Sequence, residues 1–191
     1  MFQKLIQKSR SYRRFDEAHK VDIAALKELI DLARCSPSGA NLQPLKYILV
    51  NTSDRNKKVF DTLGWAGYLK DWSGPGPGER PSAYVIILGD KEIRKDFGVD
   101  HGIAAQSIML GAAERGLGGC MIASVKREQL QEALQIPAQF EILLVLALGK
   151  PVETVKLEQV GSDGDIKYWR DAQQVHHVPK RALEEIIIKT G

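Results

Sequence analysis

Residues 100–115 (DHGIAAQSIMLGAAER) carry the strongest helical pattern of this 191-residue sequence. Apolar and small side chains repeat at helical spacing in two neighbouring rows, Ile103, Ser107 and Leu110 in one and Ala104, Ile108 and Ala112 in the other. A helix that is apolar over so wide an arc is typically buried. Gly116 is suited to end it, because glycine readily adopts the left-handed conformation that follows many helices. The pattern therefore predicts a central, buried helix over residues 100–115.

Three apolar segments predict the strands of a sheet. Residues 46–50 (KYILV) and 84–88 (YVIIL) are rich in β-branched and aromatic side chains, which favour strands. Residues 142–148 (ILLVLAL) are apolar throughout, and this indicates a strand in the middle of the sheet. Strands interleaved with helices indicate an α+β or an α/β domain.

Three further helices are expected, each after a residue that can cap it. Asp22 precedes a helical pattern over residues 22–34, and Ser53 and Ser124 precede two shorter ones. The segment after residue 116 is expected to lead into a loop before the helix that follows Ser124. These elements predict helices on the outside of the sheet.

The length suggests a single domain over residues 1–191, with two irregular parts. Residues 64–81 are rich in glycine and proline and contain Trp65, Tyr68 and Trp72, so we expect a helical turn together with an ordered covering loop. Residues 150–191 are mostly polar and have little pattern before the apolar run at 183–188. That run is too short to form a core alone, and it needs a sheet to join in this chain or in a partner. The tail is therefore expected to wrap around another subunit.

Composition excludes several classes of protein. The net charge is +3 and the basic residues are scattered apart from Arg10, Arg13 and Arg14, which read as a solvated helix end, so no nucleic-acid partner is expected. The longest apolar run is far shorter than the roughly 20 residues that span a bilayer, and the first 14 residues lack the apolar core of a signal peptide. Two cysteines, Cys35 and Cys120, fit a reducing compartment. We expect a cytoplasmic protein with no membrane partner.

Common catalytic patterns do not appear in the sequence. There is no Walker loop, and the glycines at 116–119 follow a helix, not a strand, which argues against a dinucleotide fingerprint. The histidines lack the spacing of metal ligands, and His176 and His177 would point to opposite faces of an extended segment, so no metal is expected. A dyad of Cys35 with a histidine stays open, although a lone cysteine at a helix end is more often structural. The sequence shows no side-chain machinery for hydrolysis, which favours chemistry supplied by a cofactor.

Four segments, in order along the chain, resemble the nitroreductase family of FMN enzymes. They are Arg10–Phe15 (RSYRRF), Ser36–Pro44 (SPSGANLQP), Gly116–Ile122 (GLGGCMI) and Val178–Arg181 (VPKR). The spacing of the first two is the most specific part of the resemblance. The resemblance implies an α+β fold with a mixed, mainly antiparallel sheet, and an intertwined homodimer that exchanges C-terminal strands and holds two FMN molecules at its interface.

The resemblance also implies which residues bind FMN. Arg10 and Ser11 would hold the ribityl and phosphate groups, and Arg13 would lie near N1 and O2 of the ring, where a cation stabilises negative charge. Residues of the second segment would approach the flavin of the other subunit: Ser36, Pro37, Ser38, Asn41 and Gln43. The stretch Ile122, Ala123 and Ser124 would pass the flavin face and direct a backbone N–H at N5. Lys180 and Arg181 would complete the phosphate clamp, although a solvated tail explains them equally well.

The implied reaction is a ping-pong transfer of hydride from NADH or NADPH, through flavin N5, to a small-molecule acceptor such as a nitroaromatic or a quinone. No side chain acts as an acid or base, because stacking distance and orientation set the rate. Trp65, Tyr68 and Trp72 are candidates to line the acceptor pocket, with ordinary core packing as an equal alternative. The alternatives are a related flavoenzyme with other chemistry, such as dehalogenation or flavin breakdown, and a binding module without flavin.

The match departs from the family pattern in two places. Many members have a basic residue where this chain has Ser9, so the phosphate clamp would depend more on Arg10 and the C-terminal pair. Residues 161–178, with Tyr168 and Trp169, are longer than the simplest pattern, and their role is open. The physiological acceptor, the choice between NADH and NADPH, and oxygen sensitivity do not follow from the sequence.

Overall fold

The computed structural model describes residues 2–191, which divide into two units. The first unit contains the described part of Met1–Trp65 together with Gly74–Val152. The second unit contains Ala66–Ser73 together with Glu153–Gly191. The irregular segment at 64–81 is thus shared between the two units.

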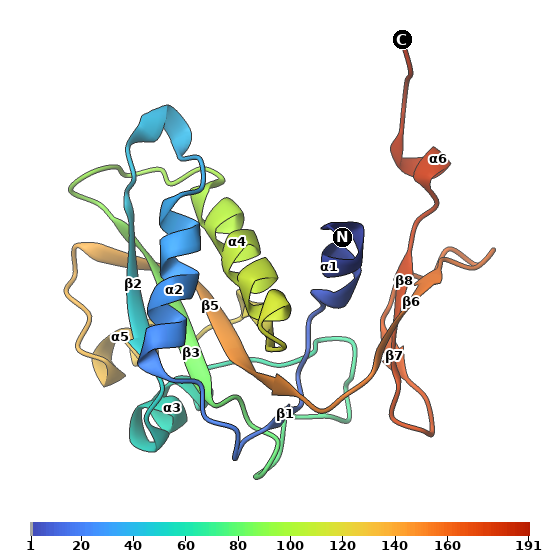
Figure 1. The fold of residues 1–191 in the computed structure, drawn as a ribbon, viewed down its shortest axis with the longest axis horizontal. Helices are drawn as coiled ribbons and strands as arrows, with labels where there is room; N and C mark the ends of the chain where they lie inside the picture. The colour runs from blue at the N-terminus through green and yellow to red at the C-terminus, as the bar shows by residue number, and fades with distance from the viewer. Residues whose placement is uncertain (1) are drawn as a thin grey trace. The chain divides into compact units, whose positions relative to one another are not determined.

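The first unit is an antiparallel sheet between helices (Figure 1). Its elements in chain order are α1 (Phe2–Lys8), β1 (Phe15–Asp16), α2 (Ile23–Arg34), the short 3-10 turn η1 (Gly39–Asn41), β2 (Leu45–Val50), α3 (Ser53–Phe60), β3 (Ala83–Asp90), α4 (Asp100–Glu114), β4 (Gly118–Ile122), α5 (Arg127–Ala133) and β5 (Phe140–Pro151). The strand order is β1-β5-β3-β2, and β4 also pairs with β5. Every pair is antiparallel, and β5 contacts three other strands, which confirms its predicted central position.

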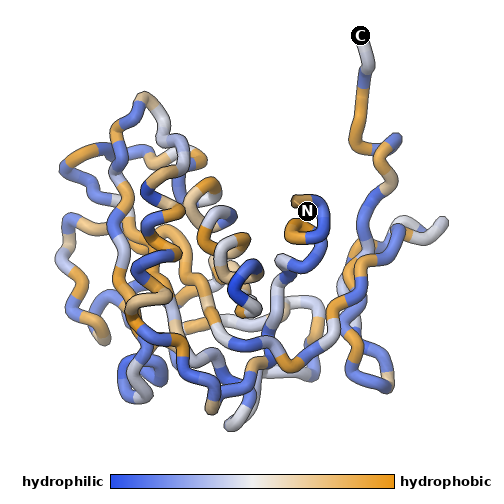
Figure 2. The backbone as a smooth tube through the Cα atoms, viewed as in Figure 1, coloured by the Kyte–Doolittle hydropathy of each residue, from blue (hydrophilic) through white to orange (hydrophobic). Residues whose placement is uncertain are grey.

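Side chains from both faces of this sheet are buried. On β3, Val85 and Ile87 join a cluster with α2 and α4, whereas Tyr84, Ile86 and Leu88 join a second cluster with α3 and α5. The alternation follows from the two-residue period of a strand. Figure 2 shows the resulting apolar character of the central strands, and the helices cover both faces as expected.

Helix α4 confirms the prediction of a central, buried helix. Ala104, Ala105, Ile108 and Ala112 are each at most 3% exposed, and the last residues of the helix lead into Gly116 with a φ of 75°. The left-handed glycine ends the helix as expected, because a side chain there would be strained.

One of the three predicted N-caps is confirmed. The carboxylate of Asp22 accepts a hydrogen bond from the N–H of Ala25 at 2.6 Å and so begins α2. The other two predictions are wrong: Thr52, not Ser53, precedes α3, and Lys126, not Ser124, precedes α5. The Ser124 carbonyl instead accepts a hydrogen bond from Gly64 N at 2.8 Å, so the chain remains extended past this residue before the helix starts.

Residues 118–122 and 64–81 can also be compared with the secondary structure expected from the sequence. Residues 118–122, expected to lead into a loop, form strand β4, because they pair with β5 over five residues. Residues 64–81 contain turns but no helix or strand, in agreement with the expected irregular segment. The role of this segment as a cover remains a prediction.

The second unit is a small sheet made by the tail. Strands β6 (Val155–Gln159), β7 (Trp169–Arg170) and β8 (His176–Lys180) have the order β6-β8-β7, and β6 is parallel to β8. The tail shows little pattern in the sequence, yet part of it forms this three-stranded sheet. The strands are held by polar and aromatic contacts, which leave no apolar periodicity in the sequence.

The apolar run at 183–188 does not form a strand within this chain. Its first residues form the short helix α6 (Leu183–Ile186), and Ile188 is 99% exposed. In Figure 2 the run is a hydrophobic stretch near the C-terminus. Such exposure is unfavourable in water, so exchange of this segment with a partner remains a prediction.

His177 is held between two carboxylates in the second unit. Its Nδ1 lies 2.6 Å from Glu158 Oε1 and its Nε2 lies 3.0 Å from Asp171 Oδ2, while the ring stacks on Trp169 at 4.1 Å. Only a protonated imidazole donates from both nitrogens. The hydrogen bonds to Asp171 and Glu158 therefore raise the pKa of His177, and the same bonds lower the pKa of each carboxyl group.

The second unit is expected to lose stability in alkaline solution. The folded unit holds the His177 proton more tightly than the unfolded chain does. The stability that this protonated imidazole contributes to the folded unit is therefore lost as pH rises through the raised pKa. The ionised carboxylates of Glu158 and Asp171 also stabilise the folded unit, and this stabilisation is lost as pH falls through their lowered pKa values. Amide hydrogen exchange in β6 and β8, corrected for intrinsic rates, should be faster at about pH 9 than at about pH 6.

The variant His177→Gln is expected to remove most of this pH dependence. His19→Gln, at an exposed position of the first unit, is the matched control and should retain it. Equal pH dependence in His177→Gln and in the unmodified protein would contradict the prediction.

None of the helices in residues 2–191 has both the length and the apolar character that crossing a bilayer requires.

Candidate functional site

The segment Arg10–Arg14 lies along strand β4. Ser11 forms a bridge with Gly119, and the N–H of Tyr12 donates to the Gly119 carbonyl at 2.9 Å. Phe15, which follows, is fully buried and pairs with Pro151 at the end of β5. These backbone contacts hold the predicted FMN-binding residues of the N-terminal segment beside the sheet.

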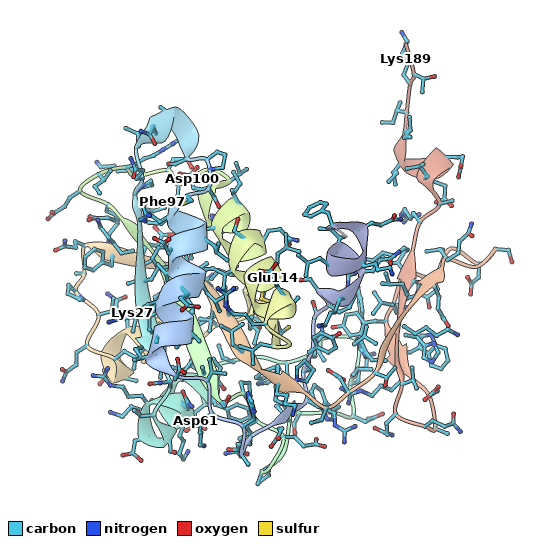
Figure 3. All side chains as sticks on the ribbon, in the orientation of Figure 1. Lys27, Asp61, Phe97, Asp100, Glu114 and Lys189 are labelled. Atoms are coloured by element: carbon cyan, nitrogen blue, oxygen red, sulfur yellow. The ribbon has the colours of Figure 1, made fainter. Side chains whose placement is uncertain are left out.

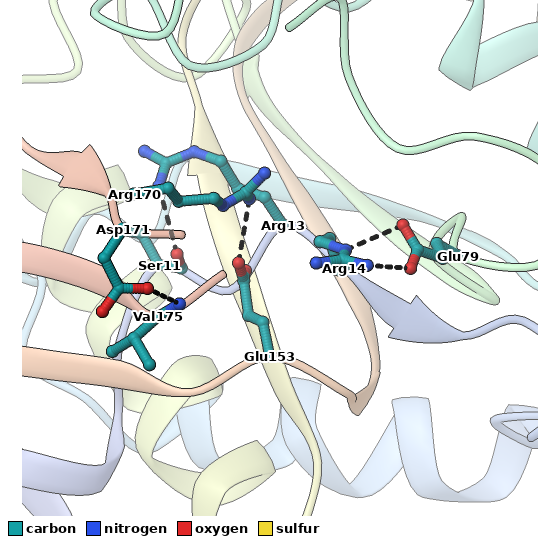
Figure 4. A network of polar contacts seen from close by, with 8 residues as sticks. All are labelled: Ser11, Arg13, Arg14, Glu79, Glu153, Arg170, Asp171 and Val175. Carbon is teal, nitrogen blue, oxygen red and sulfur yellow. Dashed lines mark hydrogen bonds and ion pairs between the residues drawn. The ribbon is translucent and has the colours of Figure 1, made fainter. Parts of the chain in front are cut away.

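The three arginines of this segment have different environments. Arg14 is used structurally, because two of its nitrogens bind the two carboxylate oxygens of Glu79, one of them at 2.8 Å (Figure 4). Arg13 is 9% exposed and donates to the Ser11 carbonyl at 3.2 Å. Arg10 donates to the Ile6 carbonyl at 2.7 Å, and its Nε is buried without a hydrogen-bond partner among residues 2–191. Arg10 thus keeps a buried donor that a ligand can satisfy.

Glycine is required where this segment meets β4. A Cβ at Gly118 would lie 2.5 Å from Cδ2 of Tyr12, and one at Gly119 would lie 2.3 Å from the Ala147 carbonyl oxygen. Both distances are far inside van der Waals contact, so a larger residue would force the strands apart. Gly118 therefore allows Tyr12 to pack against β4, and Gly119 allows β4 to lie close to β5.

The predicted stretch Ile122, Ala123 and Ser124 continues the same strand. Ile122 is buried, whereas Ala123 and Ser124 are exposed. At about 3.3 Å per residue, Ala123 lies about 13 Å along the strand from Gly119, where Ser11 is attached. The structure thus places Ser11 beside Gly119 of β4, and the predicted stretch begins at the other end of the same strand.

The loop Ser36–Pro44 is held by side chains of α4. The Oγ of Ser36 lies 2.7 Å from the Oγ of Ser107, and the Oγ of Ser38 donates to Asp100 Oδ2 at 2.6 Å. Asp100 Oδ1 also accepts from the N–H of Gly39 at 3.0 Å, and Ser38 Oγ accepts from the N–H of Gln43 at 3.0 Å. These bonds fix a loop whose backbone is strained.

The strain lies at three residues with positive φ. Ala40, Asn41 and Gln43 have φ of 50°, 56° and 51°, which residues with a side chain rarely adopt. Each residue in this conformation costs on the order of 1 kcal/mol of folding free energy, so the surrounding contacts must hold the loop in place. Asp100 contributes to holding the loop, because its carboxylate accepts hydrogen bonds from both Ser38 and Gly39.

Sequence reasoning missed Asp100 as part of the site. It is 4% exposed and begins α4, and the apolar pattern of that helix gives no sign of its contact with the loop. Burial acts to raise its pKa, but the hydrogen bonds from Ser38 and Gly39 and the charges of Arg94 and His101 outweigh burial and hold the pKa below its usual value. Asp100 is therefore ionised at neutral pH. Figure 3 labels it at the start of α4.

A pocket of about 240 Å³ opens beside this loop. Four of the predicted residues line it, together with Tyr47, Lys46 and Asp100: Ser36, Pro37, Ser38 and Gln43. Asn41 does not line it and is exposed. The structure thus brings most of the second predicted segment together around one pocket.

The loop and the N-terminal arginines lie at different ends of the first unit. In Figure 1 the loop, with η1, follows the C-terminal end of α2, whereas β1 lies near the end at which α2 begins. Twelve residues of helix are about 18 Å long. The two groups of predicted residues therefore lie near opposite ends of α2.

Lys180 and Arg181 belong to the second unit. Lys180 ends β8, and its carbonyl accepts from the N–H of Val160 at 2.9 Å. The guanidinium of Arg181 lies 3.4 Å from Glu185 Oε2 and is exposed. Their contribution to a phosphate clamp remains a prediction.

The three predicted pocket aromatics belong to different units. Trp65 is in the first unit and packs against Phe60, with ring centroids 5.7 Å apart. Tyr68 and Trp72 are in the second unit, where Tyr68 contacts Tyr168 at 4.9 Å and Trp72 lies under the guanidinium of Arg170 at 4.5 Å. Arg170 also binds Glu153 at 2.9 Å, as Figure 4 shows. Tyr68 and Trp72 thus stabilise the fold of the tail, and their role toward an acceptor remains a prediction.

Residues 2–191 contain no group of three or more ligand-type side chains placed to hold a metal ion. Cys120 is buried and Cys35 is exposed, and neither forms a disulfide.

The relationship of this chain to known proteins agrees with the arrangement of its segments. The model of the nitroreductase family matches residues 6–150, which include the N-terminal arginines, the loop at 36–44 and strand β4. The chain belongs to the nitroreductase family. It is a nitroreductase-like oxidoreductase with the α+β fold of that family.

Individual nitroreductases and related proteins are distant from this chain. MhqN of Bacillus subtilis (strain 168), which carries an NAD(P)H nitroreductase name, is 25% identical, over 78% of this chain and 88% of that protein. The NADPH-flavin oxidoreductase of Vibrio harveyi is 24% identical, over 74% of this chain and 62% of that protein. The crystal structure of a nitroreductase family protein from Streptococcus pneumoniae TIGR4 covers 100% of both chains with a TM-score of 0.72 and 18% identity, which supports the fold.

Replacing Asp100 with asparagine is expected to loosen the loop at 36–44. The amide keeps the shape but lacks the charge that strengthens the bonds to Ser38 and Gly39, and a hydrogen bond to a charged group contributes about 1.5–3 kcal/mol. Amide exchange in residues 38–43 should become roughly 10-fold faster or more. Asp96→Asn, at an exposed position before α4, is the matched control, and equal exchange in both variants would contradict the role of Asp100.

Proposed function

We propose that this nitroreductase family member is an FMN-dependent NAD(P)H oxidoreductase that acts as a homodimer. The observation that carries the proposal is the pair Arg10 and Arg13 in the segment that meets the glycine-containing strand β4, where the buried Nε–H of Arg10 has no partner within residues 2–191. A buried donor of this kind is costly unless a ligand accepts from it.

The residues along β4 suit FMN in charge and shape. Guanidinium groups bind phosphate and other anionic oxygens strongly, and two of them lie within four residues of each other. Gly118 lets the Tyr12 ring of the N-terminal segment pack directly on the strand. We propose that Arg10 and Ser11 hold the ribityl-phosphate arm, that Arg13 lies near the ring, and that Ile122, Ala123 and Ser124 line its face.

A second copy of the chain would complete the site. Ser36, Pro37, Ser38, Asn41 and Gln43 lie at the end of the first unit away from the N-terminal arginines, so we propose that they approach the cofactor bound by the partner. The exposed apolar residues of the tail support a dimer, because association would remove them from water: Leu183, Ile186, Ile187 and Ile188. We propose that this tail, with Lys180 and Arg181, wraps the partner.

Bound FMN would supply the redox chemistry, by accepting hydride at N5 from NADH or NADPH and then reducing a nitroaromatic, quinone or similar acceptor in a ping-pong cycle. The protein would bind and orient the reactants, and Arg13 would stabilise negative charge on the ring. The names of the Bacillus subtilis and Vibrio harveyi relatives support a nicotinamide donor and a flavin.

An absorbance spectrum of the purified protein tests the cofactor. We expect flavin bands after purification or after reconstitution with FMN, and a mass in solution of two chains. The rate of NADH or NADPH oxidation should rise on addition of a nitroaromatic or of benzoquinone. A colourless monomer that binds no FMN would overturn the proposal, whereas a flavoprotein that NADH and NADPH fail to reduce would point to other flavin chemistry.

A further inference from the structure

A second polar pocket lies in the first unit, between α3 and the start of β3. It has a volume of about 140 Å³ and is distinct from the pocket at the loop 36–44. The side chains that matter for its chemistry are Lys20, Asn56, Lys57, Arg80, Ser82 and Tyr84. Figure 3 labels Asp61 at the end of α3, which marks this part of the molecule.

Four polar atoms around this pocket are buried and have no hydrogen-bond partner among residues 2–191. They are Asn56 Oδ1, Arg80 Nε, Ser82 Oγ and the hydroxyl oxygen of Tyr84. Ser82 is 1% exposed and Tyr84 is fully buried. Buried polar groups are almost always hydrogen-bonded, so four of them in residues that line one pocket favour a bound species as their partner.

The four atoms define what this species must offer. Arg80 Nε is a donor only, and it needs an acceptor. Asn56 Oδ1 is an acceptor and needs a donor, because the Nδ2 of the same amide already donates to the Ser82 carbonyl at 2.8 Å. The hydroxyl groups of Ser82 and Tyr84 can donate or accept. Burial raises the pKa of Tyr84, so its hydroxyl stays protonated and remains a donor.

The charges around the pocket favour an anion. The pocket is lined by three cationic side chains, Lys20, Lys57 and Arg80, and by one anionic side chain, Glu17. Part of this charge is already used, because Lys57 pairs with Asp61 at 2.5 Å. The guanidinium of Arg80 lies over the ring of Phe60 at 4.5 Å, which fixes its direction.

The N-terminus of α3 adds to this field. Its first residue, Ser53, lines the pocket, and Thr52 before it makes no side-chain cap to the first turn. The free N–H groups of a first turn attract negative charge. The buried, unpartnered side chains remain the decisive observation.

We propose that this pocket binds hydrogen phosphate. Its unprotonated oxygens would accept from Arg80 Nε and from the hydroxyl groups of Ser82 and Tyr84, and its one remaining P–OH would donate to Asn56 Oδ1. Sulfate has the same shape and charge but carries no proton at neutral pH, so it would present a lone pair to Asn56. A phosphate monoester also loses its last proton above a pKa of about 6, and so the site selects the free ion.

Titration calorimetry on the purified protein, saturated with FMN if it binds FMN, tests the proposal in a phosphate-free buffer at about pH 7.5. Saturation keeps phosphate away from Arg10 and Arg13, and the inference does not depend on the proposed reaction. We expect inorganic phosphate to bind at one site per chain, and sulfate and methyl phosphate to bind at least about 10-fold more weakly. Equal binding of sulfate or methyl phosphate, or no binding of phosphate, would overturn the proposal.

Two variants locate the binding. Tyr84→Phe removes one hydroxyl without changing the volume, and Arg80→Lys keeps the charge but removes the Nε donor. Each is expected to weaken phosphate binding at least about 10-fold, whereas Lys58→Ala, which removes an exposed charge of α3 outside the pocket, should leave it within about 2-fold. Thermal unfolding without phosphate reports whether each variant is folded. Unchanged affinity in a folded Tyr84→Phe and a folded Arg80→Lys would also overturn the proposal.

Discussion

Replacing Arg13 with alanine is expected to raise the Kd for FMN by roughly 10- to 100-fold. The guanidinium is nearly buried beside β4, and a hydrogen bond from a charged group to an anionic ligand contributes about 1.5–3 kcal/mol. Arg10→Ala should have an effect of similar size, because it removes the buried Nε–H that has no partner in the described part of the chain. Fluorescence quenching of FMN on titration with each variant measures the change.

Two comparisons separate a specific role of Arg13 from a general effect of charge. Arg55→Ala removes an exposed arginine of α3 and should bind FMN as the unmodified protein does. Arg13→Lys keeps the charge but loses the planar pair of donors, so its affinity should lie between those of Arg13→Ala and the unmodified protein. If Arg13→Ala and Arg55→Ala bind FMN equally well, the proposed position of the cofactor is wrong.

Phe15→Ala is expected to cost about 3–5 kcal/mol of the free energy of unfolding. The ring is fully buried and fills the space above Gly149, where a Cβ would lie 2.9 Å from the Phe15 Cδ1 atom. Removal of a buried phenyl group loses its transfer free energy and leaves a cavity. At about 2–4 °C per kcal/mol for a chain of this size, Tm should fall by roughly 6–20 °C.

The same variant links stability to the site. Phe15 anchors the backbone that carries Arg10 and Arg13, so FMN affinity of the folded variant should also fall. Ile93→Ala removes an apolar side chain that is 42% exposed in the same unit, and it should change stability by no more than about 0.5 kcal/mol. A Tm for Phe15→Ala within 2 °C of that of Ile93→Ala would show that β1 contributes little to the fold.

The core of the first unit was predictable from the sequence because burial leaves a local signal. Strand β5 is apolar at every position of 142–148 because both faces of the sheet are covered, and α4 is apolar over a wide arc because it packs inside. The resemblance of Arg10–Phe15 and Ser36–Pro44 to family segments was equally local. Each of these features is a pattern of residues close together in the sequence, so it can be recognised without knowing the tertiary contacts.

Contacts between residues far apart in the sequence were not predictable in the same way. Asp100 holds Ser38 across 62 positions, and nothing near Asp100 in the sequence indicates that the loop will reach it. Ser124 looked like a helix cap, but pairing with Gly64 keeps it extended, because tertiary pairing outweighs a local capping preference.

By itself, the sequence determined that this chain builds a sheet covered by helices, one of them buried, and that it carries the family's arginine and Ser-Pro-Ser segments. Only the tertiary structure decided that the tail forms its own sheet around His177, that Asp100 pins a strained loop, and that four buried polar atoms meet beside α3. The physical reason is that apolar burial has a period along the chain. Hydrogen bonds and ion pairs depend instead on which polar groups, distant in the sequence, the fold brings within about 3 Å of each other.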